Sequence, residues 1–206
     1  MNSASSPRSP IIEWGWAGRA LEAVSGDLHV VVQFDDGAVV ALLDGLGHGH
    51  EAAQAAHAAA PIIEAHAREP VLQILQHCHE ALHKTRGAAM SIASFDARDG
   101  SMNWAGVGNV DGILLRAQQN TEVRDQAIST RGGVVGYRLP PLRAERLSLS
   151  RGDTLVMATD GIQSTFTARM PIDFTPQELA ETILVRYGKA TDDAHVVVAR
   201  YLGAHA

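Results

Sequence analysis

The sequence predicts an α+β fold in which antiparallel sheets are flanked by helices. Short apolar runs, each bounded by turn residues, follow one another along the chain in hairpin-like groups. Two helical segments, residues 51–67 and 70–83, come in direct succession before the strands resume. A doubly wound fold would alternate single strands with single helices, so this order favours antiparallel sheets.

The first hairpin brings two carboxylates together. Residues 28–34 are rich in valine and are followed by Asp-Asp-Gly, a hairpin turn signal that leads into the apolar run of residues 39–43. Asp27 begins one strand of this pair and Asp44 ends the other. The two side chains should therefore face one site at the same end of the sheet.

The other strands are predicted from short apolar runs between turn residues. We expect the first of them at a sheet edge. They lie at residues 11–16, 89–95, 101–107, 112–116, 153–159 and 195–201. The polar segment of residues 117–143, which contains paired glycines and paired prolines, predicts a meander with loose loops.

Three helices are predicted from composition and capping. Residues 51–67 are rich in alanine and contain no glycine, and residues 70–83 begin with proline. Residues 174–187 contain Thr-Pro-Gln-Glu near their start, in which threonine is the N-cap and proline takes the first helical position. The first two helices follow Asp44 directly, and they could serve as core alone or also regulate the site.

The composition is that of one globular domain. The chain has 206 residues, of which 46% are hydrophobic and 19% charged, enough for one substantial core. We predict a disordered, Pro/Ser-rich leader at residues 1–10 and a single domain over residues 11–203. No apolar run approaches the roughly 20 residues that span a bilayer. The net charge of −6, without a basic stripe, argues against nucleic acid as a partner.

Cysteine and histidine are not expected to carry the chemistry. Cys78 is the only cysteine, which excludes an internal disulfide and favours the cytoplasm, and its place inside a predicted helix indicates a core residue. His77, His79 and His83 lie close together, and the last two share a helical face. No acidic third ligand of the HExxH type accompanies them, so we expect solvated histidines on the helix surface.

Aspartates at strand ends indicate a metal centre. Asp160 follows an apolar strand and precedes glycine, as Asp44 does, while Asp192 and Asp193 stand where the last strand begins, as Asp27 does. Clustered carboxylates without histidine or cysteine suit Mg²⁺ or Mn²⁺, which prefer oxygen ligands. Two such ions about 3.5–4 Å apart could share a carboxylate, acidify a water and neutralise a phosphoryl group.

Six short motifs occur in a fixed order along the chain. They are Ser25-Gly26-Asp27, Asp44-Gly45-Leu46-Gly47-His48-Gly49, Arg86-Gly87-Ala88-Ala89-Met90, Gly106-Val107-Gly108-Asn109, Ala158-Thr159-Asp160-Gly161 and Asp192-Asp193-Ala194. Each is common by itself, whereas the ordered set with these spacings is specific. The set resembles the PPM-type metal-dependent serine/threonine phosphatases over nearly the whole chain. Within that family it is most similar to the bacterial SpoIIE branch and its small stand-alone RsbX-like members.

The resemblance implies a fold and a metal-ligand set. The fold would be a central β-sandwich of two antiparallel sheets flanked by helices, with two Mn²⁺ or Mg²⁺ ions at one end. Asp44 would bridge the ions, and the carbonyl of Gly45 would bind one of them. Asp160 and Asp192 would hold the second ion, with Asp193 as the rival of Asp192 for that position.

The resemblance assigns catalysis to carboxylates rather than to a histidine, serine or cysteine. The four residues are Asp27, Asp44, Asp160 and Asp192. Asp27 would act on metal-bound water, either as a metal ligand itself or by hydrogen bonding from behind the ligands. An arginine that grips the phosphate is not specified. The alternatives for that role are Arg19, Arg86 and Arg131.

For a small stand-alone member of the branch, the resemblance implies a monomeric cytoplasmic enzyme that acts on a protein. Its substrate would be a phosphorylated Ser or Thr on a STAS-domain protein, either an anti-sigma-factor antagonist or a stressosome component in bacterial partner-switching signalling. Two alternatives stay open: a catalytically silent phosphoprotein-binding module on the same fold, and a metal-dependent hydrolase of small phosphate esters. Degenerate relatives lose metal carboxylates, and all of them are present here, which favours the enzyme.

Overall fold

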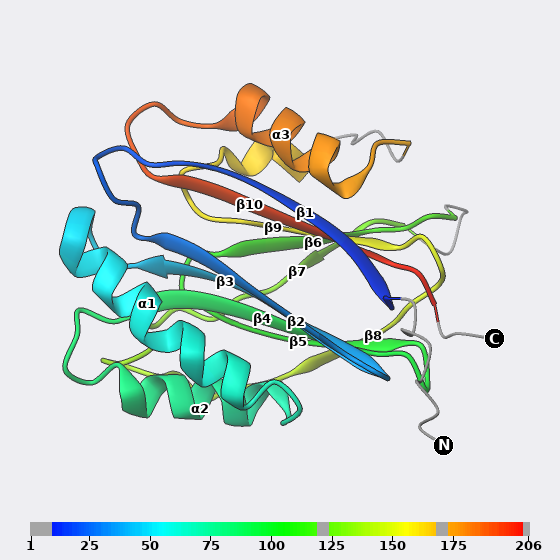
Figure 1. The fold of residues 1–206 in the computed structure, drawn as a ribbon, viewed down its shortest axis with the longest axis horizontal. Helices are drawn as coiled ribbons and strands as arrows, with labels where there is room; N and C mark the ends of the chain where they lie inside the picture. The colour runs from blue at the N-terminus through cyan, green and yellow to red at the C-terminus, as the bar shows by residue number, and fades with distance from the viewer. Residues whose placement is uncertain (1–9, 119–123, 168–172, 204–206) are drawn as a thin grey trace, which may run out of the picture.

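Two antiparallel sheets packed face to face form the centre of the structure, a computed structural model that describes residues 10–118, 124–167 and 173–203 (Figure 1). One sheet, the β1 sheet, has the strand order β1 (Ile12–Arg19), β10 (Ala194–Tyr201), β9 (Thr154–Ala158), β6 (Asp111–Leu115) and β7 (Gln126–Ile128). The other, the β2 sheet, has the order β2 (Asp27–Phe34), β3 (Gly37–Gly45), β4 (Ala88–Asp96), β5 (Ser101–Val107) and β8 (Glu145–Ser148).

Helices cover the outer face of each sheet. α1 (Gly49–Ala65) and α2 (Val71–Ala81) pack on the β2 sheet, and α3 (Pro176–Tyr187) packs on the β1 sheet (Figure 1). A short 3₁₀ turn, η1 (Ser164–Thr167), precedes α3. The layers therefore run helix, sheet, sheet, helix, which confirms the predicted α+β sandwich.

The interior strand β3 explains why one stretch of the sequence is an unbroken apolar run. Successive side chains of a strand point to opposite faces of its sheet. Val40 and Leu42 belong to the core between the two sheets, whereas Val39, Ala41 and Leu43 belong to the core beneath α1 and α2. A strand that is covered on both faces has no solvent side, so it shows no alternation with polar residues.

The hairpin, the edge strand and the helix cap that the sequence predicts are all found in the structure. The predicted hairpin is confirmed, because β2 and β3 pair antiparallel with Phe34 opposite Gly37. The predicted edge position of β1 is also confirmed. At the start of α3, the backbone N–H of Thr175 donates to Glu178 Oε2 at 2.9 Å, and Thr175 Oγ1 accepts from the Glu178 N–H at 3.3 Å. These reciprocal bonds are a capping box, as the Thr-Pro-Gln-Glu sequence predicts.

The strand β8 and the turn η1 were not predicted. β8 is a four-residue strand at a sheet edge in which only Leu147 is buried, so it has almost no apolar pattern. It is a strand because its backbone pairs with β5. The predicted leader of residues 1–10 lies outside the described residues except for Pro10, as does the part of the predicted meander at residues 119–123.

Two compositional expectations can be compared with the structure. Cys78 is a buried core residue of α2, as predicted, and burial raises the pKa of its thiol to about 12. A thiol with so high a pKa is protonated at neutral pH and is a poor nucleophile.

Within the described ranges, no helix is both long enough and apolar enough to cross a membrane.

Candidate metal centre

The predicted strand-end carboxylates gather at one end of the β-sandwich. Asp27 and Asp44 lie directly opposite each other in the register of β2 and β3. Asp160 follows β9, and Asp192 precedes the adjacent strand β10, so both come from the β1 sheet. Asp44, Asp160 and Asp192 line one cavity of about 610 Å³. Both sheets therefore contribute carboxylates to a single site.

The glycine after each of two aspartates is required by close packing. A Cβ atom on Gly45 would lie 2.0 Å from the carbonyl oxygen of Ala52 in the first turn of α1. A Cβ atom on Gly161 would lie 1.7 Å from the carbonyl oxygen of Asp193. Both distances are far shorter than van der Waals contact, so only glycine fits. These Asp-Gly pairs are therefore sites of close backbone approach, not simple turns.

The two adjacent aspartates before β10 have different surroundings. Asp193 is buried, and its two oxygens accept backbone hydrogen bonds from Leu21 at 2.6 Å and from Gly26 at 2.7 Å. Asp192 is half-buried, faces the cavity, and among the described residues accepts only the N–H of Asp193, at 3.0 Å. Asp193 thus ties the loop between β1 and β2 to the start of β10, whereas Asp192 presents oxygen to the cavity.

Asp27 lies behind the cavity and is held by a residue that the sequence reasoning missed. Its Oδ2 accepts from Thr159 Oγ1 at 2.7 Å, and the backbone N–H of His195 donates to the same hydroxyl at 2.9 Å. Thr159 is therefore a link between the β2 sheet and two strands of the β1 sheet. Its presence in the Ala-Thr-Asp-Gly motif was the signal that could have identified it.

Asn109 is a second residue that was noted only as part of a motif. Its Nδ2 donates to Asp160 Oδ2 at 2.6 Å, and it lines the cavity beside Asp44. Hydrogen bonding from Asn109 also lowers the pKa of Asp44, which opposes the larger effects that raise it. A neutral amide can orient two carboxylates here without taking the place of a cation.

Burial and mutual repulsion raise the pKa values of two carboxyl groups in this cluster. The pKa of Asp27 rises from 3.8 to about 8, first through burial and next through repulsion by Asp44. The pKa of Asp44 rises from 3.8 to about 7, first through burial and then through Asp160 and Asp192. Without a cation among them, such groups keep protons at a higher pH than an ordinary carboxyl group does.

The donor set fits a hard divalent cation. Three carboxylates face one cavity, and among the described residues no lysine or arginine forms an ion pair with Asp27, Asp44, Asp160 or Asp192. His48 also lines the cavity, but its Nδ1 is 2.7 Å from a carboxylate oxygen of Glu22. Oxygen donors without histidine or thiolate suit Mg²⁺ or Mn²⁺.

A comparison with known families covers most of the chain. The family model described as Stage II sporulation protein E (SpoIIE) matches residues 35–202. The chain belongs to the SpoIIE family. It is a metal-dependent serine/threonine protein phosphatase of the PPM type, and it depends on Mn²⁺ or Mg²⁺.

Relatives of this SpoIIE-family phosphatase include proteins and solved structures of similar length. Phosphoserine phosphatase RsbX of Bacillus subtilis (strain 168) is 25% identical over 141 residues, which are 68% of this chain and 69% of RsbX. A structure described as "The bacterial stressosome: a modular system that has been adapted to control secondary messenger signaling" is 32% identical, with 92% of this chain and 99% of that one covered and a TM-score of 0.82. RsbX in complex with magnesium is 20% identical, covers 95% of this chain and 98% of its own, and shows the same fold with a TM-score of 0.79.

The three arginines considered for gripping phosphate lie in different places in the SpoIIE-family fold. Arg86 is at the rim of the metal cavity, because a Cβ atom on the cavity residue Gly47 would lie 2.7 Å from its Nη1. Arg86 is paired with Glu51 of α1. The guanidinium of Arg19 donates to a backbone carbonyl, and Arg131 lines a different pocket. Of these three side chains, that of Arg86 is the one placed at the rim of the metal cavity.

The histidines expected on the surface of the second helix are exposed (His83) or half-buried (His77 and His79), but each of them also has a polar partner. His79 Nδ1 accepts from the backbone N–H of Gly136 at 2.9 Å, and His83 Nδ1 lies 3.0 Å from the carbonyl oxygen of Gly136. His77 Nε2 lies 3.0 Å from Glu69 Oε2. These side chains fasten α2 to its neighbouring loops, which a helical spacing rule cannot foresee.

We expect Asp193→Asn to destabilise the protein and Asp192→Asn to leave its stability nearly unchanged. An amide nitrogen cannot accept a hydrogen bond, so Asp193→Asn leaves the N–H of Leu21 or Gly26 without an acceptor. The free energy of unfolding should fall by about 1–3 kcal/mol, as for other buried unsatisfied groups. Urea unfolding of both variants in EDTA measures this. A larger decrease in the free energy of unfolding for Asp192→Asn than for Asp193→Asn would contradict the separate roles of the two residues.

The raised carboxyl pKa values predict how stability depends on pH without metal. A carboxyl group whose pKa is higher in the folded state stabilises that state below its unfolded pKa, near 3.8, and the contribution disappears as pH rises through the folded pKa. In EDTA, the free energy of unfolding should therefore decrease toward pH 8. Urea unfolding at several pH values should show a weaker decrease for Asp44→Asn than for the wild type, and Mn²⁺ should restore stability at pH 8. Equal pH slopes for the two proteins would refute this.

Proposed function

We propose that this chain hydrolyses phosphoserine or phosphothreonine on a regulatory protein at the carboxylate cluster. The observation that carries the proposal is that Asp44, Asp160 and Asp192, delivered by two different sheets, line one cavity. The raised pKa of Asp44 supports a cation there rather than a purely structural cluster. All the predicted carboxylate positions are present around this cavity, so no observation favours a catalytically silent binding module.

The residues have separate parts in this proposal. Asp44, Asp160 and Asp192 would hold two Mn²⁺ or Mg²⁺ ions with the carbonyl of Gly45, and Asp193 would stay out of the ligand set because both of its oxygens accept backbone hydrogen bonds. When bound, two such ions neutralise phosphoryl oxygens and lower the pKa of a water. Asp27 would orient that water or accept its proton through Oδ1, because Oδ2 is engaged by a threonine hydroxyl.

The proposal also specifies the class of protein that carries the phosphate group. We propose a phosphorylated STAS-domain protein, either an anti-sigma-factor antagonist or a stressosome component, that meets the enzyme in the cytoplasm. The likeness to RsbX and to a structure from work on the bacterial stressosome supports a partner-switching role. We also propose that residues 11–203 act as one phosphatase domain and as a monomer. The core that the two sheets share, which runs from Ile11 to Tyr201, supports one domain.

Asp44→Asn and Asp160→Asn should each lower phosphatase turnover by more than about 100-fold, because each change removes a charge that holds a metal ion. The fold should survive, since the remaining carboxylates repel each other less.

The matched control is Asp36→Asn, at the opposite end of the same β2–β3 hairpin, which should keep wild-type turnover. Turnover is measured at saturating Mn²⁺ on a phosphorylated STAS-domain protein and on an aryl phosphate. Near-normal turnover in either site variant would refute the site, and activity on the aryl phosphate alone would refute the protein substrate.

Removal of divalent metal should abolish activity reversibly. An all-oxygen site that keeps several waters binds its ions weakly, so EDTA followed by desalting should give an inactive and folded protein. Mn²⁺ should restore more turnover than Mg²⁺. Initial rates and circular dichroism before and after metal addition make the test. Full activity in EDTA, or recovery with Zn²⁺ alone, would show that the carboxylates are not the working site.

A further inference from the structure

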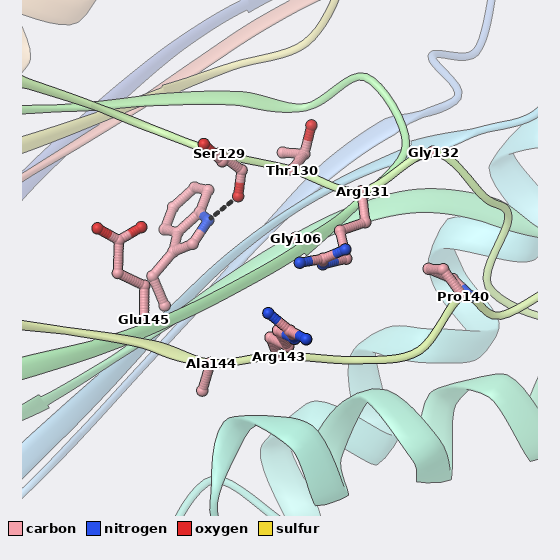
Figure 2. Close-up of a pocket in the computed structure, with 10 residues that line it drawn as sticks. Gly106, Ser129, Thr130, Arg131, Gly132, Pro140, Arg143, Ala144 and Glu145 are labelled. Atoms are coloured by element: carbon pink, nitrogen blue, oxygen red, sulfur yellow. Dashed lines mark hydrogen bonds between the residues drawn. The ribbon is translucent and has the colours of Figure 1, made fainter.

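A second cavity, of about 650 Å³, lies on the β2 sheet where its last strands meet the segment after β7. Its floor is formed by Trp104 and Gly106 of β5. One wall is the segment of residues 129–132, and the other is the segment of residues 140–145 that leads into β8 (Figure 2). Trp104 is fixed in this floor, since it is 1% exposed and its Nε1 donates to the carbonyl oxygen of Ser129 at 3.2 Å.

Two arginines face each other across this cavity. Arg131 comes from one wall and Arg143 from the other, and Figure 2 shows both guanidinium groups directed into the space between the walls. Among the described residues, neither side chain forms an ion pair or a hydrogen bond, whereas Arg98, Arg116 and Arg146 each pair with an aspartate. Two like charges on facing walls repel each other, and a bound anion would relieve that repulsion.

One carboxylate also lines the cavity but does not neutralise the arginines. Glu145 Oε1 accepts from Gln126 Nε2 at 2.8 Å. In Figure 2 the carboxylate of Glu145 points away from Arg131 and Arg143. The positive end of the cavity is therefore open to a negative group from outside the chain, although the chain as a whole has a net charge of −6.

The arginine cavity and the metal centre share one segment of backbone. The N–H of Arg131 donates to the carbonyl of Gly106 at 3.0 Å, and the carbonyl of Arg131 accepts from Gly108 at 2.8 Å, which fastens this wall to the end of β5. Gly108 and, two residues beyond Arg131, Gly133 line the metal cavity. Gly132 lines the arginine cavity and its chain neighbour Gly133 lines the metal cavity, so the two cavities adjoin along this segment.

We propose that the cavity between Arg131 and Arg143 docks an acidic segment of the phosphoprotein substrate. The guanidinium groups take Asp or Glu carboxylates of that segment, because a planar guanidinium matches the geometry of a carboxylate. This inference rests on the proposed function and deepens it. The docking cavity lets the enzyme select a protein with acidic residues near its phosphorylated site over a small phosphate ester that has none.

The experiment compares two synthetic phosphoserine peptides of equal length, one flanked on both sides by glutamates and the other by glutamines. For the Mn²⁺-loaded full chain, kcat/KM should be about tenfold higher for the glutamate peptide, chiefly through KM, as expected for one or two charge-assisted contacts. The double variant Arg131→Gln/Arg143→Gln should lose this preference and keep wild-type hydrolysis of p-nitrophenyl phosphate. The matched control, Arg138→Gln/Arg186→Gln, removes two exposed arginines outside the cavity and should keep the preference.

The outcomes separate the docking proposal from the proposed function. Equal kcat/KM for the two peptides, or an equal loss of preference in the control variant, would overturn the docking cavity while the phosphatase stands. If the wild type cleaves neither peptide nor p-nitrophenyl phosphate, the proposed function fails. Fluorescence anisotropy then tests the cavity with the unphosphorylated glutamate peptide: binding that Arg131→Gln/Arg143→Gln weakens supports docking, and absence of binding refutes it.

Discussion

The repulsion among carboxylates gathered at one partly buried end of the β-sandwich is the constraint on which this structure depends. Burial raises the pKa values of Asp27 and Asp44, and neighbouring aspartates raise them further. Within the described part of the chain, no cationic side chain is paired with them. Protons or divalent ions among the carboxylates would reduce this repulsion.

Both sheets are tied together at the end that carries the charges. Asp193, from the start of β10, binds backbone N–H groups of the loop that precedes β2. Thr159, from the end of β9, binds Asp27 on the other sheet. Gly45 and Gly161 permit the close approach of α1 and of residue 193. The positions of these carboxylates are thus set by close backbone packing and buried hydrogen bonds, which is how a rigid scaffold preorganises a site.

The arginine cavity beside the metal centre is held in place in the same way and bears on which substrate is selected. The wall of residues 129–132 is fastened to β5 by backbone hydrogen bonds, and the chain continues directly into residues that line the metal cavity. A charged cavity in this position can contribute binding energy from parts of a substrate that do not react. Such remote contacts distinguish one phosphoprotein from another although the reacting group is the same.

The sequence by itself determined what depends on near neighbours in the chain: the β2–β3 hairpin, the capped helix α3, the apolar strand β3 and the aspartates at strand ends. Only the tertiary structure shows that Asp192 and Asp193 have different surroundings, because the partners of Asp193 are as far as 172 residues away in the chain. It also decided that β8 is a strand and that Arg131 faces Arg143. Two adjacent aspartates look alike in the sequence. Only long-range packing determines which of them faces a cavity and which one binds backbone N–H groups.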